Sequence, residues 1–212
     1  PIGGRFHPAM LAQAAATLDS MYPGRLLLGV GAGEAVNEAR FFQSQRADWP
    51  GWKERIERLA EALTLMRELW TRDDYFTFRG RYFPMSDVLL YTKPKTKIPI
   101  YFAAMGPKSA AYAGKFGDHL ITITSPKKCR ETIFPRFNDA AIATGKDPRK
   151  AEKMVLVNLM IGDPKESLEK LKSGWAGFLS RGTFDEPDPR RVEASASTVD
   201  DSLITEYFQL CP

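Results

Sequence analysis

The chain has 212 residues, a formal net charge of +4 at pH 7, and ordinary shares of hydrophobic (43%) and charged (26%) side chains. This length allows one domain with a sizeable core, and the composition argues against a disordered protein. No apolar run approaches the roughly 20 residues of a membrane-spanning helix, and the basic residues are too scattered to form a nucleic-acid surface. With only Cys129 and Cys211, no disulfide framework is expected, so we predict a cytoplasmic location.

The first predicted element is a helix that begins at Pro8, where a proline costs no hydrogen bond, and ends before Pro23-Gly24. Its expected apolar side comprises Met10, Leu11, Ala14, Leu18 and Met21. The apolar run from Arg25 to Val30 then predicts a short buried strand.

Three alternate glycines, Gly29, Gly31 and Gly33, accompany the end of this strand and lead directly to Glu34. Glycines let the backbone turn sharply and approach a ligand closely, and in α/β folds ligands bind at this end of a strand. A dinucleotide fingerprint is excluded, because G-x-G-x-x-G requires glycine where Glu34 or Val36 stands. From the spacing alone, a tight turn with a solvated glutamate is an equally good interpretation.

Residues 35–51 are predicted to be an irregular, aromatic-rich connection, and long connections at strand ends are often functional. An amphipathic helix is predicted from Trp52 to Trp70, followed by a small hairpin around Arg79-Gly80-Arg81. The later predicted elements are strands at 98–104, 119–124 and 154–161, helices at 107–116, 128–144 and 164–179, a surface loop at 181–201, and a last segment at 203–210.

Strands that alternate with helices predict a parallel sheet with right-handed crossovers. Four clear strands are too few to close an eight-stranded barrel, so an open doubly wound sheet and the middle of a barrel both fit. The chain starts at Pro1 rather than methionine and stops at Cys211-Pro212 without a terminal helix. We therefore expect a part of a longer protein; processing or a genuinely short protein are the alternatives.

The stretch Gly29–Glu38, which follows Pro23-Gly24-Arg25, resembles the glycine–glutamate signature of deazaflavin-dependent enzymes in the bacterial-luciferase-like superfamily. Within it, the sequence is most similar to coenzyme F420-dependent glucose-6-phosphate dehydrogenases and related alcohol dehydrogenases. His7-Pro8, the Arg79–Phe83 segment and Gly106-Pro107-Lys108 agree with this resemblance, which covers most of residues 5–180.

The resemblance implies an α/β luciferase-like TIM (β/α)8 barrel. It also implies that the first strands and the last βα unit are missing, together with the catalytic histidine of the family, to which His7 does not correspond. Residues 1–212 are then expected to form a single, partial barrel domain with an excursion at about 181–201.

Site residues follow from the resemblance position by position. Glu34 matches the active-site glutamate, which is proposed to exchange a proton with the deazaflavin ring as hydride moves to or from C5. Three residues match positions beside the cofactor: Ala32, Gly33 and Asn37. Four match the turn that holds its phosphate at a helix N-terminus: Met105, Gly106, Pro107 and Lys108. Without the resemblance, an ordinary helix start is the simpler interpretation of this turn.

For a substrate phosphate, the candidate ligands are Thr124 and Lys127, although a solvated lysine in a loop is the commoner situation. Further cations of the family fall near Ala194 and Tyr207, which are not basic. This departure puts glucose 6-phosphate in doubt and leaves an alcohol or another sugar open as the substrate.

The resulting hypothesis is an F420-dependent oxidoreductase that acts on an alcohol or sugar-phosphate hydroxyl and forms a homodimer. Two alternatives stay open: an FMN-dependent monooxygenase of the same superfamily, and a non-catalytic barrel subunit. A metal centre is not expected, because His7, His119 and Cys129 are not spaced as ligands, and His119 is interpreted as structural. No G-x-S-x-G elbow occurs, which disfavours a serine hydrolase.

Overall fold

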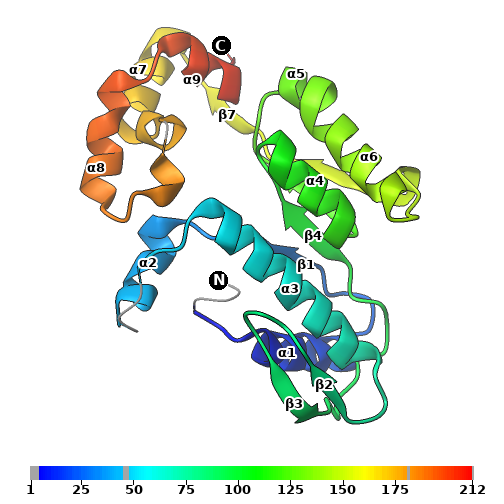
Figure 1. Cartoon of the computed structure of the whole chain (residues 1–212). Helices are drawn as coiled ribbons and strands as arrows, with labels where there is room; N and C mark the ends of the chain where they lie inside the picture. Colours follow the sequence, from blue (N-terminus) through cyan, green and yellow to red (C-terminus); the bar gives the residue numbers. More distant parts are fainter. Residues whose placement is uncertain (1–4, 45–47, 181, 212) are drawn as a thin grey trace.

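The computed structural model describes residues 5–44, 48–180 and 182–211, and a four-stranded parallel sheet lies at its centre (Figure 1). In spatial order the strands are β1 (Leu28–Val30), β4 (Ile100–Ala103), β5 (His119–Thr122) and β6 (Lys153–Val155). Leu28 is paired with Ile100, Tyr101 with His119, and Leu120 with Lys153. Because the strands are parallel, their carboxyl ends meet at one edge of the sheet.

The helices cover the sheet much as the periodicity predicts. The predicted helices correspond to α1 (Pro8–Met21), α3 (Trp52–Thr71) and α4 (Pro107–Phe116). The helix predicted between β5 and β6 consists of α5 (Pro126–Lys128), a π-helical turn (Cys129–Ile133) and α6 (Phe134–Ala143). Pro135 at the start of α6 has no N–H to donate, which accounts for the widened turn before it.

The buried side of α1 is not the predicted one. Small side chains face the core and α3: Ala12, Ala15 and Ala16. The expected apolar side is largely exposed: Met10 (65%), Leu18 (47%) and Met21 (61%). Alanines let the two helix backbones come close, and the Trp70 indole N–H donates to the Ala12 carbonyl at 2.9 Å. Close packing against α3 therefore outweighs side-chain hydrophobicity in orienting α1.

A helix, α2 (Ala35–Ser44), replaces the irregular connection predicted after Glu34. The Glu34 carbonyl accepts hydrogen bonds from the N–H groups of Asn37 (3.1 Å) and Glu38 (3.0 Å), which start the helix. Ala35 and Ala39, one helical turn apart, are 0% and 1% exposed and bury its inner side. The glycine turn thus leads straight into a helix.

The predicted hairpin exists, but its second strand begins later than expected. Strands β2 (Phe76–Phe78) and β3 (Met85–Val88) pair in antiparallel fashion. The Glu61 carboxylate on α3 accepts hydrogen bonds from three consecutive backbone N–H groups, those of Arg81 (2.9 Å), Tyr82 (2.8 Å) and Phe83 (2.7 Å). These groups are therefore not used for strand pairing.

The single strand predicted at 154–161 is divided between two sheets. After β6, the chain leaves the central sheet, and β7 (Asn158–Ile161) pairs in parallel with β8 (Phe208–Cys211). The Leu156 N–H still bonds to the Thr122 carbonyl at 2.8 Å, so the division falls just after this residue.

The region predicted as a surface loop at 181–201 is largely helical; Arg181 lies outside the described residues. Its elements are the 3-10 helix η4 (Thr183–Asp185), the α-helix α8 (Pro189–Ala194) and the 3-10 helix η5 (Ser195–Thr198). They stand between α7 (Pro164–Gly174), followed by η3 (Ala176–Leu179), and α9 (Asp201–Tyr207). A small core holds this group: Leu171, Ala176, Ile204 and Phe208. Asp188 and Asp200 cap the short helices, which explains how a polar stretch becomes ordered. Figure 1 shows α7, α8 and α9 gathered apart from α4 and α6.

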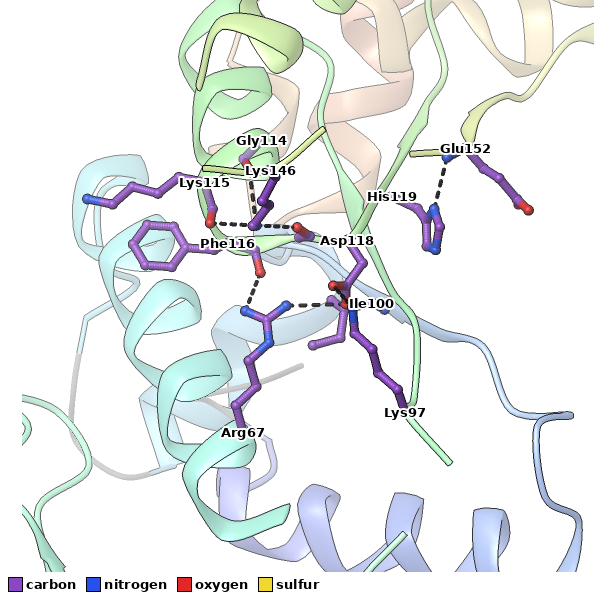
Figure 2. A network of polar contacts seen from close by, with 11 residues as sticks. Arg67, Lys97, Ile100, Gly114, Lys115, Phe116, Asp118, His119, Lys146 and Glu152 are labelled. Atoms are coloured by element: carbon purple, nitrogen blue, oxygen red, sulfur yellow. Dashed lines mark hydrogen bonds and ion pairs between the residues drawn. The ribbon is translucent and has the colours of Figure 1, made fainter. Parts of the chain in front are cut away.

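A polar network stabilises the opposite, amino-terminal ends of β4 and β5 (Figure 2). Asp118 accepts hydrogen bonds from Lys97 Nζ (2.7 Å) and the Ile100 N–H (3.1 Å) and pairs with Arg67 (3.3 Å). Lys146 Nζ donates to three carbonyls at the end of α4, those of Gly114, Lys115 and Gly117. His119 is structural, as predicted: its Nδ1 accepts from the Glu152 N–H at 2.9 Å.

Candidate functional site

A cavity of about 530 Å³ lies at the carboxyl ends of β1, β4 and β5, where α/β barrels place their active sites. Its walls come from the glycine turn, the start of α3, the ends of β4 and β5, and η4. Of the residues singled out in the sequence, it brings together Ala32, Gly33, Glu34, Asn37 and Met105.

Glu34 lies in the wall of this cavity and not on the outer helical layer. One of its carboxylate oxygens, Oε2, accepts a hydrogen bond from Asn37 Nδ2 at 3.0 Å. The Asn37 carbonyl in turn accepts from Arg5 at 3.0 Å. Since Asn37 lies one turn further along α2, the helix itself sets the orientation of the carboxylate.

The glycine turn needs glycine at Gly33 for a conformational reason. Its φ of +81° lies in the left-handed region, which side chains disfavour. A Cβ at Gly31 would meet Ala103 Cβ at 3.5 Å, an ordinary contact. Gly31, Ala103 and Ala104 therefore make a floor of small residues across two neighbouring strands.

The start of α4 supplies a second wall, but only part of the predicted phosphate turn reaches it. Met105 and Ser109 line the cavity, with Gly106 as the N-cap between them. The Gly106 N–H donates to Ser109 Oγ at 3.1 Å. Pro107 and Lys108 are exposed, and Lys108 lines a separate cavity of about 910 Å³ among α3, α4 and α6. Among the described residues that line this larger cavity, none lies at the end of a strand.

Thr124 and Lys127 are not among the residues that line the cavity with Glu34. Thr124 is buried, and its hydroxyl donates to Tyr207 Oη at 3.4 Å. The lysine that reaches the same Tyr207 hydroxyl, also at 3.4 Å, is Lys128, whereas Lys127 is exposed. Helix α9 therefore covers the segment that the resemblance assigns to a phosphate.

Three cavity residues have no signal in the sequence: Arg55, Thr122 and Phe184. Arg55 occurs on a helix rich in charges, Thr122 ends an ordinary strand, and Phe184 falls in a polar stretch. Only the tertiary structure brings them to the strand ends. Ser109 is not predicted either; its Oγ accepts the N–H of Gly106, the N-cap of α4.

Among the described residues, no group of three or more His, Cys, Asp or Glu side chains could hold a metal ion. In the same part of the chain, no helix combines the length and the apolar character that crossing a membrane would require. Cys129 is buried in the core, and this burial raises the pKa of its thiol.

Comparisons with known proteins agree with this geometry. The luciferase-like monooxygenase family matches residues 2–204. The F420-dependent glucose-6-phosphate dehydrogenase of Mycolicibacterium gilvum is 37% identical over 197 residues, which are 91% of this chain and 57% of that protein. The enzyme of the same name from Rhodococcus erythropolis is 39% identical over 202 residues, which are 92% and 58% of the two chains.

Among solved structures, an F420-dependent secondary alcohol dehydrogenase in complex with an F420–acetone adduct is 39% identical, with a TM-score of 0.87. The match covers 98% of this chain and 62% of that one. This likeness confirms the predicted α/β barrel fold. The chain spans less than two thirds of the length of each of these relatives.

Proposed function

This chain belongs to the luciferase-like monooxygenase family, and we propose that the complete protein is an F420-dependent oxidoreductase. It would transfer hydride between the carbon of an alcohol or sugar-phosphate CH–OH group and the deazaflavin C5. The observation that carries this proposal is the position of Glu34 on the glycine turn, in the wall of the strand-end cavity. The names of the relatives support the choice of cofactor and of reaction.

The residues of the cavity fit a flat ring system with an anionic substituent. Small residues form the floor, and the first N–H groups of α4 have no acceptors within the helix, which suits an anion. Ala32, Gly33 and Asn37 would line the ring, and Met105 with Gly106 and Pro107 would hold the phosphate. Lys108, on the outer side, would act only through its charge. When bound, the deazaflavin supplies the site that accepts the hydride.

Glu34 would hold or release the proton that balances the charge change of the ring. A Glu34→Gln variant should keep the F420 dissociation constant within a few-fold but lose about 100-fold or more in turnover, the usual contribution of a positioned acid or base. Glu131→Gln, an exposed glutamate outside the cavity, is the matched control. Unchanged turnover in Glu34→Gln contradicts the role of Glu34; a complete protein that does not bind F420 contradicts the whole proposal.

The proposal includes two substrate classes, alcohols and sugar phosphates. Thr124 and Lys127 remain the predicted ligands for a sugar phosphate, with Lys128 as the neighbour that shares the Tyr207 contact. Activity of the complete protein with secondary alcohols and with glucose 6-phosphate, measured side by side, decides between the classes.

The second candidate function is that of an FMN-dependent monooxygenase. The description of the matching family, luciferase-like monooxygenase, favours it. Binding of FMN in preference to F420, with oxygen-dependent turnover, would establish this alternative. A non-catalytic barrel subunit would bind neither cofactor.

A homodimer is also proposed, in the cytoplasm. The exposed side of α1 supports it, since three large apolar side chains, Met10, Leu18 and Met21, lie there beside the exposed Tyr22. Light scattering of the complete protein tests the dimer, and a Leu18→Glu, Met21→Glu double variant should yield monomers if α1 forms the interface. The location rests on the low cysteine content, and cell fractionation tests it.

A further inference from the structure

Arg55 and Thr122, in the wall of the cavity, each carry a buried polar atom that has no hydrogen-bond partner in the described part of the chain. These atoms are Arg55 Nε, at the start of α3, and Thr122 Oγ1, at the end of β5. The two residues are only 5% and 3% exposed. A buried donor without an acceptor lowers the stability of a fold, so native proteins seldom keep one without a reason. The two atoms therefore indicate a ligand that accepts hydrogen bonds from them.

The Arg55 guanidinium is held in one orientation by the contacts of its other atoms. Its Nη1 donates to Asp185 Oδ1 at 2.7 Å and to the Pro50 carbonyl at 2.6 Å. The group also lies 4.6 Å from the centre of the Trp49 ring. Because a guanidinium is planar, these contacts fix the direction of its Nε–H bond as well. A ligand would therefore meet a donor that needs no rearrangement before it binds.

Stability alone does not account for a cation at this position. Arg55 lies in the first turn of α3, where the helix dipole disfavours a positive charge, and its side chain is buried. Glu34 and Glu38 line the same cavity, and Glu38 pairs with Arg5 at 4.0 Å. Among the described residues that line the cavity, Arg55 is the cation. An anionic group in this cavity would depend on it.

The start of α4 adds further donors to the same cavity. Pro107 has no N–H, and the Ala110 N–H bonds to the Gly106 carbonyl at 2.9 Å. The N–H groups of Lys108 and Ser109 therefore have no acceptor inside the helix, and Ser109 lines the cavity. A guanidinium, a hydroxyl and a helix N-terminus together are a set of donors that suits a phosphate.

We propose, on the basis of the function given above, that Arg55 Nε–H and the Thr122 hydroxyl donate hydrogen bonds to the phosphate of the deazaflavin cofactor. Arg55 supplies the positive charge, Thr122 supplies a neutral hydrogen bond, and the first N–H groups of α4 supply the remaining donors. The phosphate is that of the cofactor because the glycine turn with Glu34, which the proposed function places beside the ring, belongs to the same cavity. Asp185 and the phosphate would then share one guanidinium.

The test uses the complete protein and two ligands that differ only in the phosphate: the ribityl deazaflavin and its 5′-phosphate. Fluorescence titration gives both dissociation constants, and their ratio reports what the phosphate contributes. In the wild type, the phosphorylated ligand should bind about 100-fold more tightly, as expected for hydrogen bonds from one charged and one neutral donor. Arg55→Met should remove about 10- to 30-fold of this preference and Thr122→Val about 3- to 5-fold, while the unphosphorylated ligand keeps its affinity within about twofold.

Two further variants accompany these. Arg55→Lys, which keeps the charge but cannot serve Asp185 and the phosphate together, should give an intermediate ratio. Arg58→Met, on the same helix but outside the residues that line the cavity, should keep the wild-type ratio. Because both constants are measured on one variant, a partial loss of folded protein does not change their ratio. If Arg55→Met does not fold, the ratios of Arg55→Lys and Thr122→Val decide.

Equal losses of affinity for the two ligands in Arg55→Met, or an unchanged ratio, overturn the phosphate contact. An unchanged ratio together with a higher KM for glucose 6-phosphate alone would mean that Arg55 serves a substrate phosphate, and it also overturns the assignment to the cofactor. A wild type that binds F420 but does not prefer the phosphorylated ligand overturns this inference and leaves the proposed function standing. If the wild type does not bind F420, the proposed function fails, and the inference with it.

Discussion

Arg55 Nη1 and Asp185 Oδ1 lie 2.7 Å apart although 130 residues separate them in the chain. The Arg55 side chain is only 4% exposed, and its guanidinium lies 4.6 Å from the centre of the Trp49 ring. The same Nη1 donates to the Pro50 carbonyl at 2.6 Å. This contact joins the start of α3 to η4 at the edge of the cavity, so it links the central sheet with the group of short helices.

Asp185→Asn should lower the free energy of unfolding, because a buried guanidinium loses its counter-charge. Asp185 is itself half-exposed, so we expect a loss of about 1–2 kcal/mol, the lower end for hydrogen bonds to charged groups. Urea denaturation of the two proteins measures it. Glu169→Gln, which removes an exposed partner of Lys172, should cost much less. Equal losses in the two variants would contradict the special role of the Arg55 contact.

Gly33→Ala should destabilise the glycine turn by about 1–2 kcal/mol, because alanine disfavours a positive φ. Space is not limiting there, since the nearest atoms would lie 3.5 Å from the new Cβ. Gly29→Ala is the control, with nothing within 4 Å and no positive φ. Thermal unfolding compares the two variants, and F420 titration should show weaker binding only for Gly33→Ala. A Gly33→Ala variant as stable as Gly29→Ala would contradict the strain argument.

Glu61→Gln should destabilise the protein by about 1–3 kcal/mol, because a carboxylate that accepts three backbone N–H groups is replaced by a neutral amide with one acceptor oxygen. The loss should appear locally as faster hydrogen exchange at residues 81–83. Glu68→Gln, one of an exposed pair with Arg72, serves for comparison. Unchanged exchange at 81–83 would mean that Glu61 does not hold this segment.

The stability contributed by Asp118 should disappear in acid. Burial alone would raise the pKa of Asp118, but the hydrogen bond from Lys97, the charge of Arg67 and the Ile100 N–H together hold this pKa below its ordinary value of 3.8. A group whose pKa is lower in the folded state stabilises the fold above its unfolded pKa, and the contribution is lost as the pH falls through the folded pKa. Below about pH 4, therefore, the unfolding free energy should drop.

Asp118→Asn isolates this contribution. At pH 7 the variant should be about 1–3 kcal/mol less stable than the wild type, and the difference should shrink as the pH falls below 4. Chemical denaturation between pH 2.5 and 7 provides the measurement. Asp73→Asn removes an exposed carboxyl group. Its unfolding free energy should differ from that of the wild type by the same amount at every pH between 2.5 and 7. A constant difference between Asp118→Asn and wild type at all pH values would contradict the assignment.

The pattern of neighbouring residues in the sequence predicts most of the helices and strands, because the formation of each depends on residues close to one another in the chain. The 3.6-residue period of α3 and the prolines that open α1 and α4 all correspond to observed helices. The prediction was wrong where long-range contacts decide. The alanine side of α1 is buried because α3 packs against it. Three N–H groups after Gly80 turn to Glu61 rather than to a strand.

The residues of the candidate site likewise include some that the sequence predicts and some that it does not. The glycine turn and Glu34 stand out in the sequence because a positive φ and a strand-end carboxylate have local signatures. Arg55 and Phe184 have none, since each becomes a site residue only through a partner far along the chain. Lys108 and Lys127 are exposed and do not line the cavity with Glu34, so their contacts with a ligand stay a prediction from the resemblance.

The sequence by itself determined the alternation of strands and helices, the bend at Gly33 and the acid that follows it, because backbone conformation and periodicity are properties of adjacent residues. Only the tertiary structure decided which side chains share the cavity with Glu34 and which charges are neutralised there. The reason is physical: parallel strands place their ends together whatever the length of the connections, so the neighbours of a strand-end residue are set by packing across the sheet.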